Sequence, residues 1–123
     1  MKVNRFSEAT RYDAPNHRAF MDLCLQGFES DGPTNQWGGI SHFHPGGGAG
    51  PDSSPCEKVY VCLVGGVRVD VDGVEFVLNP MDSCTVAPNE VRDDRQPSEP
   101  SRDDVGRHAV PARVRTRRAD CAR

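Results

Sequence analysis

The feature that most constrains the fold is a pair of alternating apolar runs joined by Asp72-Gly73. In residues 67–71 and 74–78, apolar side chains recur at every second position, which is typical of strands that bury one face. Asp-Gly between two such runs predicts a β-hairpin with a type I′ turn, because that turn needs positive φ at both central residues. The chain shows no long run with the 3.6-residue period of a helix. The sequence therefore predicts an all-β protein.

Further short apolar runs are separated by turn residues along most of the chain. We expect strands in four more segments, residues 19–28, 37–44, 58–64 and 83–87. Residues 45–56 are rich in Gly, Pro and Ser, and this composition predicts a surface loop. Several short strands at close spacing favour a sandwich or a barrel.

The bulk properties exclude several classes of protein. A chain of 123 residues has room for one core, and its net charge of −3 provides no basic field for nucleic acid. No segment approaches the roughly 20 apolar residues that cross a bilayer, and the first residues contain no apolar stretch typical of a signal peptide. We therefore expect a cytoplasmic protein that binds neither nucleic acid nor membrane.

The cysteines indicate packing rather than cross-linking. Their number, five, is odd, and no Cys-x-x-Cys pair occurs, so we expect neither a disulfide framework nor a structural zinc site. Cys24, Cys62 and Cys84 lie in apolar runs and are interpreted as small buried side chains.

Two motifs appear in an order that is similar to the cupin family. His42-Phe43-His44 ends one predicted strand, Glu57 follows, and the next strand closes on Gly65; residues 79–92 then match the second cupin motif in outline. The resemblance covers roughly residues 19–92. It implies a conical β-barrel (a double-sheet jelly roll), a cavity for a small-molecule ligand, a homodimer, and in many cases a divalent metal.

The candidate metal ligands are His42, His44 and Glu57. Two histidines at i and i+2 of a strand point to the same face, and two imidazoles with a carboxylate suit Fe, Mn, Ni or Zn. The resemblance, however, implies a carboxylate at the position of Lys58 and a histidine at the position of Arg92. Arginine stays protonated and does not ligate metals, so a metal-bound and a metal-free barrel both remain open.

Tyr60 and Arg92 are the candidate ligand-binding residues. Tyr60 shares a strand face with Cys62, and it either hydrogen-bonds a ligand inside the barrel or packs in the core. Arg92 either binds a ligand carboxylate through two parallel hydrogen bonds or is a surface charge. The function indicated is that of a cupin-domain protein binding a small molecule, with a metal-dependent reaction of dioxygenase or isomerase type. The alternatives are a metal-free cupin that binds a ligand without chemistry, and an inactive truncated cupin.

After Arg92 the character of the sequence changes. Residues 93–123 are dense in Arg, Asp and Pro and lack apolar alternation, which predicts a barrel domain at 1–92 and an irregular or disordered tail at 93–123. The barrel would then be incomplete at its C-terminal end. A one-base shift of the reading frame over residues 94–111 permits codons for an apolar strand instead. We therefore hypothesise that a single-base insertion near the codon of Asp93 put the tail out of frame.

Overall fold

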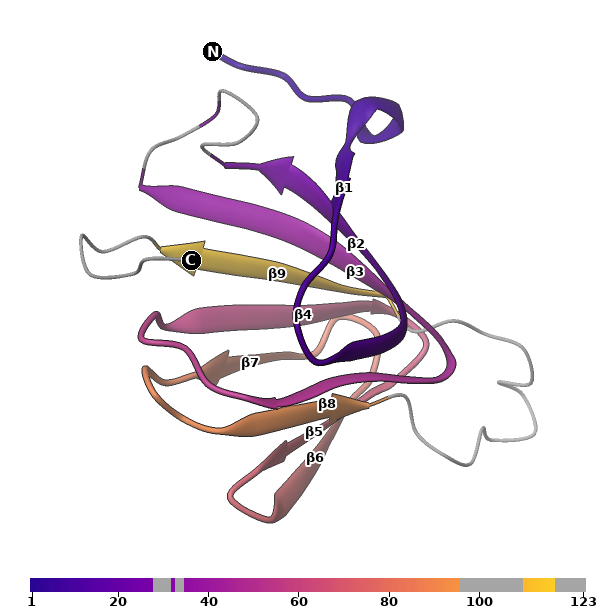
Figure 1. Cartoon of the computed structure of the whole chain (residues 1–123), viewed down its shortest axis with the longest axis vertical. Helices are drawn as coiled ribbons and strands as arrows, with labels where there is room; N and C mark the ends of the chain where they lie inside the picture. Colours follow the sequence, from indigo (N-terminus) through magenta and orange to yellow (C-terminus); the bar gives the residue numbers. More distant parts are fainter. Residues whose placement is uncertain (28–31, 33–34, 96–109, 117–123) are drawn as a thin grey trace.

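The computed structural model is almost entirely β-structure and describes residues 1–27, 32, 35–95 and 110–116 (Figure 1). One short 3-10 helix, Phe6–Glu8, precedes the first strand. The strands are β1 (Thr10–Tyr12), β2 (His17–Gln26), β3 (Gln36–Asp52), β4 (Lys58–Val64), β5 (Val67–Val71), β6 (Val74–Leu78), β7 (Ser83–Val86), β8 (Arg92–Arg95) and β9 (Val110–Thr116). In the part of the chain that the structure describes, no helix is long and apolar enough to span a membrane.

The strands form one curled antiparallel sheet. Along it the order is β6-β5-β8-β3-β9-β4-β7, and β2 pairs with β3 while β1 pairs with β2. β3 is long enough to pair with strands in two parts of the sheet. Its first part runs beside β2 and β9, and after a bend its last part runs beside β8 (Figure 1). Among the described pairings β6 and β7 each have one neighbour, so they form the two ends of the strand path. This arrangement confirms the predicted all-β, cupin-type barrel.

The hairpin that anchors the sequence prediction forms as expected. Val71 pairs with Val74, and Asp72 and Gly73 have φ of 52° and 77°, as a type I′ turn requires. The Gly73 N–H also donates a hydrogen bond of 3.0 Å to the Asp70 carboxylate, which closes the turn. The strands predicted at residues 19–28, 37–44, 58–64 and 83–87 correspond to β2, the first half of β3, β4 and β7.

Residues 45–52 are not a loop, and here the sequence prediction was wrong. β3 continues through Pro45 and the following glycines to Asp52. Glycine is needed because the backbones cross closely: a Cβ at Gly47 would lie 2.3 Å from the Ala19 carbonyl oxygen. A composition typical of loops therefore marks the bend at which β3 passes from one half of the barrel to the other.

Side chains from both halves of the barrel form one hydrophobic core. Its buried members are Phe43, Tyr60, Cys62, Val67, Val69, Leu78 and Val86. Phe20 packs on this cluster with its ring 4.5 Å from that of Phe43. Cys24 and Cys62 are buried free thiols and Cys84 is a half-buried one, as predicted, whereas Cys56 is disulfide-bonded, which we did not expect.

Two strands fall in the segment for which irregular structure was predicted. β8 begins at Arg92 and runs into the tail, and β9 lies between β3 and β4. Backbone hydrogen bonds can pair a strand whose side chains show no apolar alternation, so this pairing left no signal in the sequence. Residue 92 is therefore no boundary between strand and tail, while residues 96–109 and 117–123 lie outside the described part.

Candidate functional site

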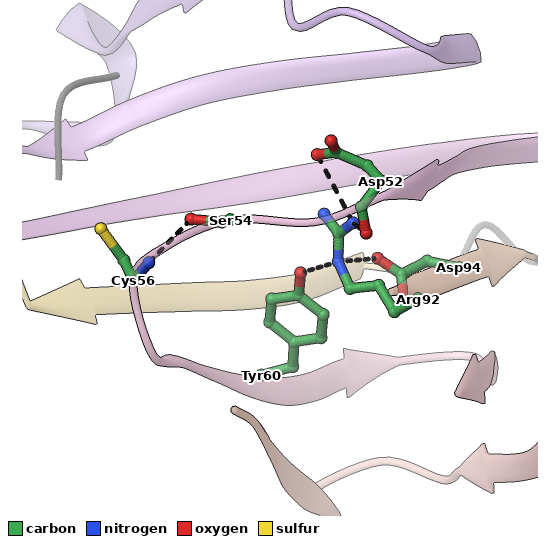
Figure 2. Close-up of polar contacts among 6 residues, drawn as sticks. All are labelled: Asp52, Ser54, Cys56, Tyr60, Arg92 and Asp94. Atoms are coloured by element: carbon green, nitrogen blue, oxygen red, sulfur yellow. Dashed lines mark hydrogen bonds and ion pairs between the residues drawn. The ribbon is translucent and has the colours of Figure 1, made fainter. Parts of the chain in front are cut away.

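A buried polar cluster surrounds Arg92, whose side chain is 3% exposed. The Arg92 Nε–H donates a 2.5 Å hydrogen bond to the Tyr60 hydroxyl and lies 3.4 Å from a carboxylate oxygen of Asp94. The Arg92 Nη1 donates to the Asp52 backbone carbonyl at 3.0 Å and is 3.5 Å from the Asp52 carboxylate. Figure 2 shows these side chains converging from three strands. The cluster thus holds one cation between two carboxylates and a phenol.

Strand register explains why these residues meet. β8 lies between β3 and β5, with Arg92 opposite Asp52 and Asp94 opposite Val69. Arg92 and Asp94 are two residues apart on β8 and both are buried, so they share its inner face. Tyr60 reaches the same interior from β4. Each side chain is therefore placed by the barrel rather than by a loop.

The electrostatics keep the cluster charged. Burial alone would lower the pKa of Arg92, but Tyr60, Asp94 and Asp52 outweigh it, so the pKa of this guanidinium is raised above its ordinary value. Its charge is compensated by hydrogen bonds and carboxylates, as a buried charge requires. The guanidinium also lies over the Tyr60 ring, 5.8 Å from its centroid.

A cavity of about 470 Å³ opens beside this cluster, between the β5–β6 hairpin and β7. Its lining is mostly apolar, with a thiol, a hydroxyl and two carboxylates: Val69, Val71, Asp72, Val74, Phe76, Cys84, Thr85, Val86 and Glu90. A volume of this size falls within the range of pockets that hold small molecules. Val86 and Glu90 also line a smaller hollow against Arg92, so the cavity and the buried cluster are neighbours.

Two carboxylates act on the inner part of this cavity. Burial raises the pKa of the Cys84 thiol, and the negative charges of Asp94 and Glu90 raise it further. Cys84 is therefore a neutral thiol at physiological pH and a poor nucleophile. The same interactions place both carboxylates within electrostatic reach of a residue that lines the cavity.

The predicted ligand-binding residues lie together, whereas the three predicted metal ligands do not form one group, although His42 and His44 are neighbours. Tyr60 and Arg92 are both buried and hydrogen-bonded to each other. Sequence reasoning missed Asp52, Asp94 and Glu90. Asp94 lay in the segment interpreted as irregular, and an isolated carboxylate without strand register carries no signal of its partners.

His42 and His44 share one face of β3, with ring centroids 5.3 Å apart. Phe43 between them is in the core, so the histidines occupy the opposite face of the strand. Glu57 is exposed and precedes β4. In the described residues no three His, Cys, Asp or Glu side chains are grouped to hold a metal ion. The residues present therefore do not fit a three-ligand centre at His42, His44 and Glu57, and the metal site stays a prediction.

Comparison with curated proteins identifies a clear relative. The chain is 44% identical over 92 residues to the β-D-galactosidase Rv1717 of Mycobacterium tuberculosis, which covers 75% of this chain and 79% of that protein. Cupin-2 domain proteins match the fold over nearly the whole chain. This chain belongs to the same family as that relative, and its fold is that of the cupins. No protein-family model matches it.

Solved structures show how closely this cupin follows the common fold. An RmlC-like cupin from Shewanella frigidimarina covers 98% of this chain and 94% of its own, with a TM-score of 0.74 and 15% identity. The polyketide cyclase RemF of Streptomyces resistomycificus covers 94% of this cupin and 79% of its own chain, with a TM-score of 0.77 and 15% identity. A cupin-superfamily sugar phosphate isomerase from Silicibacter pomeroyi covers 95% and 76%, with a TM-score of 0.73 and 12% identity. At these identities the likeness shows the fold alone.

Proposed function

We propose that this cupin binds a small carbohydrate in the cavity between the β5–β6 hairpin and β7, and that it hydrolyses a β-D-galactoside there. The observation that carries the proposal is the 44% identity to a protein named a β-D-galactosidase. The cavity supports it, because its lining combines an apolar wall with two carboxylates, Asp72 and Glu90.

The lining suits a sugar ring. A pyranose has an apolar face and a rim of hydroxyls, so it needs an aromatic or aliphatic surface together with a few polar acceptors. Phe76, which is 55% exposed, supplies an aromatic surface at the cavity mouth. Glu90 supplies a carboxylate on the opposite side of the opening from the hairpin.

Glycosidic bonds are commonly cleaved by two carboxyl groups. One protonates the leaving oxygen, and the other either attacks the sugar as a nucleophile or activates the water that does so. Glu90 lines the cavity, and Asp94, which lies 3.4 Å from Arg92, is close enough for its charge to raise the pKa of Cys84 in the cavity lining. We assign Glu90, which lines the cavity, as the carboxyl group that acts on the substrate, and Asp94, which is 1% exposed and ion-paired with Arg92, as a positioning residue. Arg92 and Tyr60 would then position Asp94 from behind.

The test is hydrolysis of a chromogenic aryl β-D-galactoside, with the α-galactoside and β-glucoside as comparison substrates. We expect turnover of the β-galactoside, lost in Glu90→Gln and in Asp94→Asn. Glu75→Gln is the matched control, since Glu75 is an exposed carboxylate on the β5–β6 hairpin and is ion-paired with Arg68. Equal activity in Glu90→Gln and the wild type would refute the assignment. Absence of both turnover and saturable galactoside binding would refute the proposed function.

A second candidate is a metal-dependent reaction of dioxygenase or isomerase type. The adjacent rings of His42 and His44 favour it, because two neighbouring imidazoles are a partial donor set for Fe, Mn, Ni or Zn. This candidate predicts that a chelator abolishes the activity and that added metal restores it in the wild type. Added metal should not restore activity in His42→Ala. Galactoside turnover that persists in chelator would favour the first proposal instead.

A further inference from the structure

The two positions at which the cupin resemblance implies a carboxylate and a second-motif histidine are occupied by cations in this chain. Lys58 and Arg92 stand there, and both line the same small hollow together with Ser53, Ser54 and Glu90. A divalent cation placed at this point would face two positive side chains at short range. Like charges in a partly buried site repel strongly, so the local field disfavours the ion.

Arg92 is held in this position by several contacts. Its guanidinium contacts Tyr60, Asp52 and Asp94 at the same time, and Asp94 is only 1% exposed. Carboxylates gathered about a buried positive charge are also what a protein uses to hold a metal ion. Here the positive charge is covalently part of the chain, and it is permanent because arginine does not lose its proton.

The histidine pair offers no alternative place for the ion inside the barrel. His42 and His44 lie on the face of β3 opposite the core residue Phe43, whereas Tyr60 and Arg92 are interior. The two imidazoles therefore lie on the face of β3 that points away from Phe43 and the core.

We propose that the Arg92 guanidinium stands in place of a metal ion, as the fixed positive charge of this barrel's interior, and that the barrel works without a divalent metal. Arg92 orients the Tyr60 hydroxyl and the Asp94 carboxylate beside the cavity, and Lys58 reinforces the exclusion of cations. The inference does not depend on which ligand binds, because its readout is metal content rather than activity.

The first test is the metal content of the untagged full chain, purified from cells grown with added Fe, Mn, Ni and Zn. We expect well below one transition metal ion per chain by mass spectrometry, and no shift of the melting temperature on adding each ion. A stoichiometric metal that disappears in His42→Ala or His44→Ala would overturn the proposal.

The second test reverses the substitution. Arg92→His removes the fixed cation and places an imidazole beside the carboxylates of Asp52 and Asp94, which together form a donor set for divalent metals. We expect this variant to gain binding of Ni or Zn by calorimetry, and to lose it again in the double variant with Asp94→Asn. Arg92→Met is the control that removes the charge without adding an oxygen or nitrogen ligand, and it should gain nothing.

Each outcome decides the matter. A folded Arg92→His variant that binds no metal would show that Arg92 does not stand at a metal position. Equal gain in Arg92→His and Arg92→Met would contradict the proposal, because it would show that the imidazole at this position does not ligate the metal. Should Arg92→His fail to fold, the metal content of the wild type still confirms or overturns the metal-free barrel.

Discussion

Replacing Arg92 by methionine should destabilise this cupin more than any surface substitution. The methionine fills most of the space of the arginine stem but leaves Asp94, which is 1% exposed, without the opposite charge 3.4 Å away. Removing one partner of a buried ion pair costs about 3–5 kcal/mol. A domain of this size has a free energy of unfolding of roughly 5–15 kcal/mol, so the variant should lose about a fifth of it or more.

The structure also predicts how that loss is distributed. Arg92→Met with Asp94→Asn removes both charges, so the double variant should lose clearly less than the sum of the two single variants. Tyr60→Phe removes a hydrogen-bond acceptor from a charged donor and should cost about 1.5–3 kcal/mol. The matched control is Arg68→Met: its partner Glu75 is 3.3 Å away, the two side chains are 32% and 46% exposed, and the pair is worth at most about 1 kcal/mol.

Urea unfolding at equilibrium measures these differences. Trp37 is the single tryptophan and is 6% exposed, so its fluorescence reports directly on loss of the folded barrel. We expect the midpoint to fall sharply in Arg92→Met and hardly at all in Arg68→Met, with unchanged slopes. If the two variants differ by less than about 1 kcal/mol, or if the double variant is fully additive, the buried network does not hold the barrel together as argued.

Two further predictions rest on the structure and two on the sequence. Gly47→Ala should destabilise the barrel by about 1–3 kcal/mol in the same urea assay, since its Cβ would meet the Ala19 carbonyl oxygen at 2.3 Å; a neutral result would mean that β2 and β3 do not cross as described. The raised pKa of Cys84 means that the folded state keeps this thiol protonated at a pH where the unfolded state ionises it. The contribution of the thiol to the free energy of unfolding is therefore intact below about pH 8.5 and is lost as the pH rises. Cys84→Ser should lose less stability than the wild type between pH 7 and pH 10. Deleting one base near the codon of Asp93 should give a chain with a higher urea midpoint if the tail is out of frame, and a lower one if the present tail is native. We also expect a homodimer by light scattering, and a monomer at all concentrations would contradict it.

The all-β fold could be predicted from the sequence because the strongest signals in the sequence are local. Alternation at residues 67–71 and 74–78 and the Asp72-Gly73 turn depend only on neighbours along the chain, and these elements were predicted correctly. The segment 45–52 was mispredicted for the same reason. Its glycines are required by a backbone from a distant strand, and a composition-based argument contains no information about that contact.

The candidate site shows the same division. Tyr60 and Arg92 could be singled out because the order of the cupin motifs placed both near the barrel interior, and the structure brings them to one hydrogen bond. Their partners could not: Asp52 is 40 residues from Arg92 and lies on another strand, and Asp94, two residues away on β8, fell in a segment for which no strand was predicted. The face that each side chain occupies is likewise a matter of register, which a bulge or a one-residue shift reverses.

By itself, then, the sequence determined that this chain is all-β and forms the hairpin at Asp72-Gly73, because strand periodicity and turn chemistry are local properties; the order of its motifs added the resemblance to cupins. Only the tertiary structure decided that His42 and His44 lie opposite the core, that β8 carries Arg92 and Asp94 into a buried ion network, and that a cavity opens between the β5–β6 hairpin and β7. The pairing of strands that are far apart in the sequence determines these features, because it decides which charged side chains meet inside the barrel.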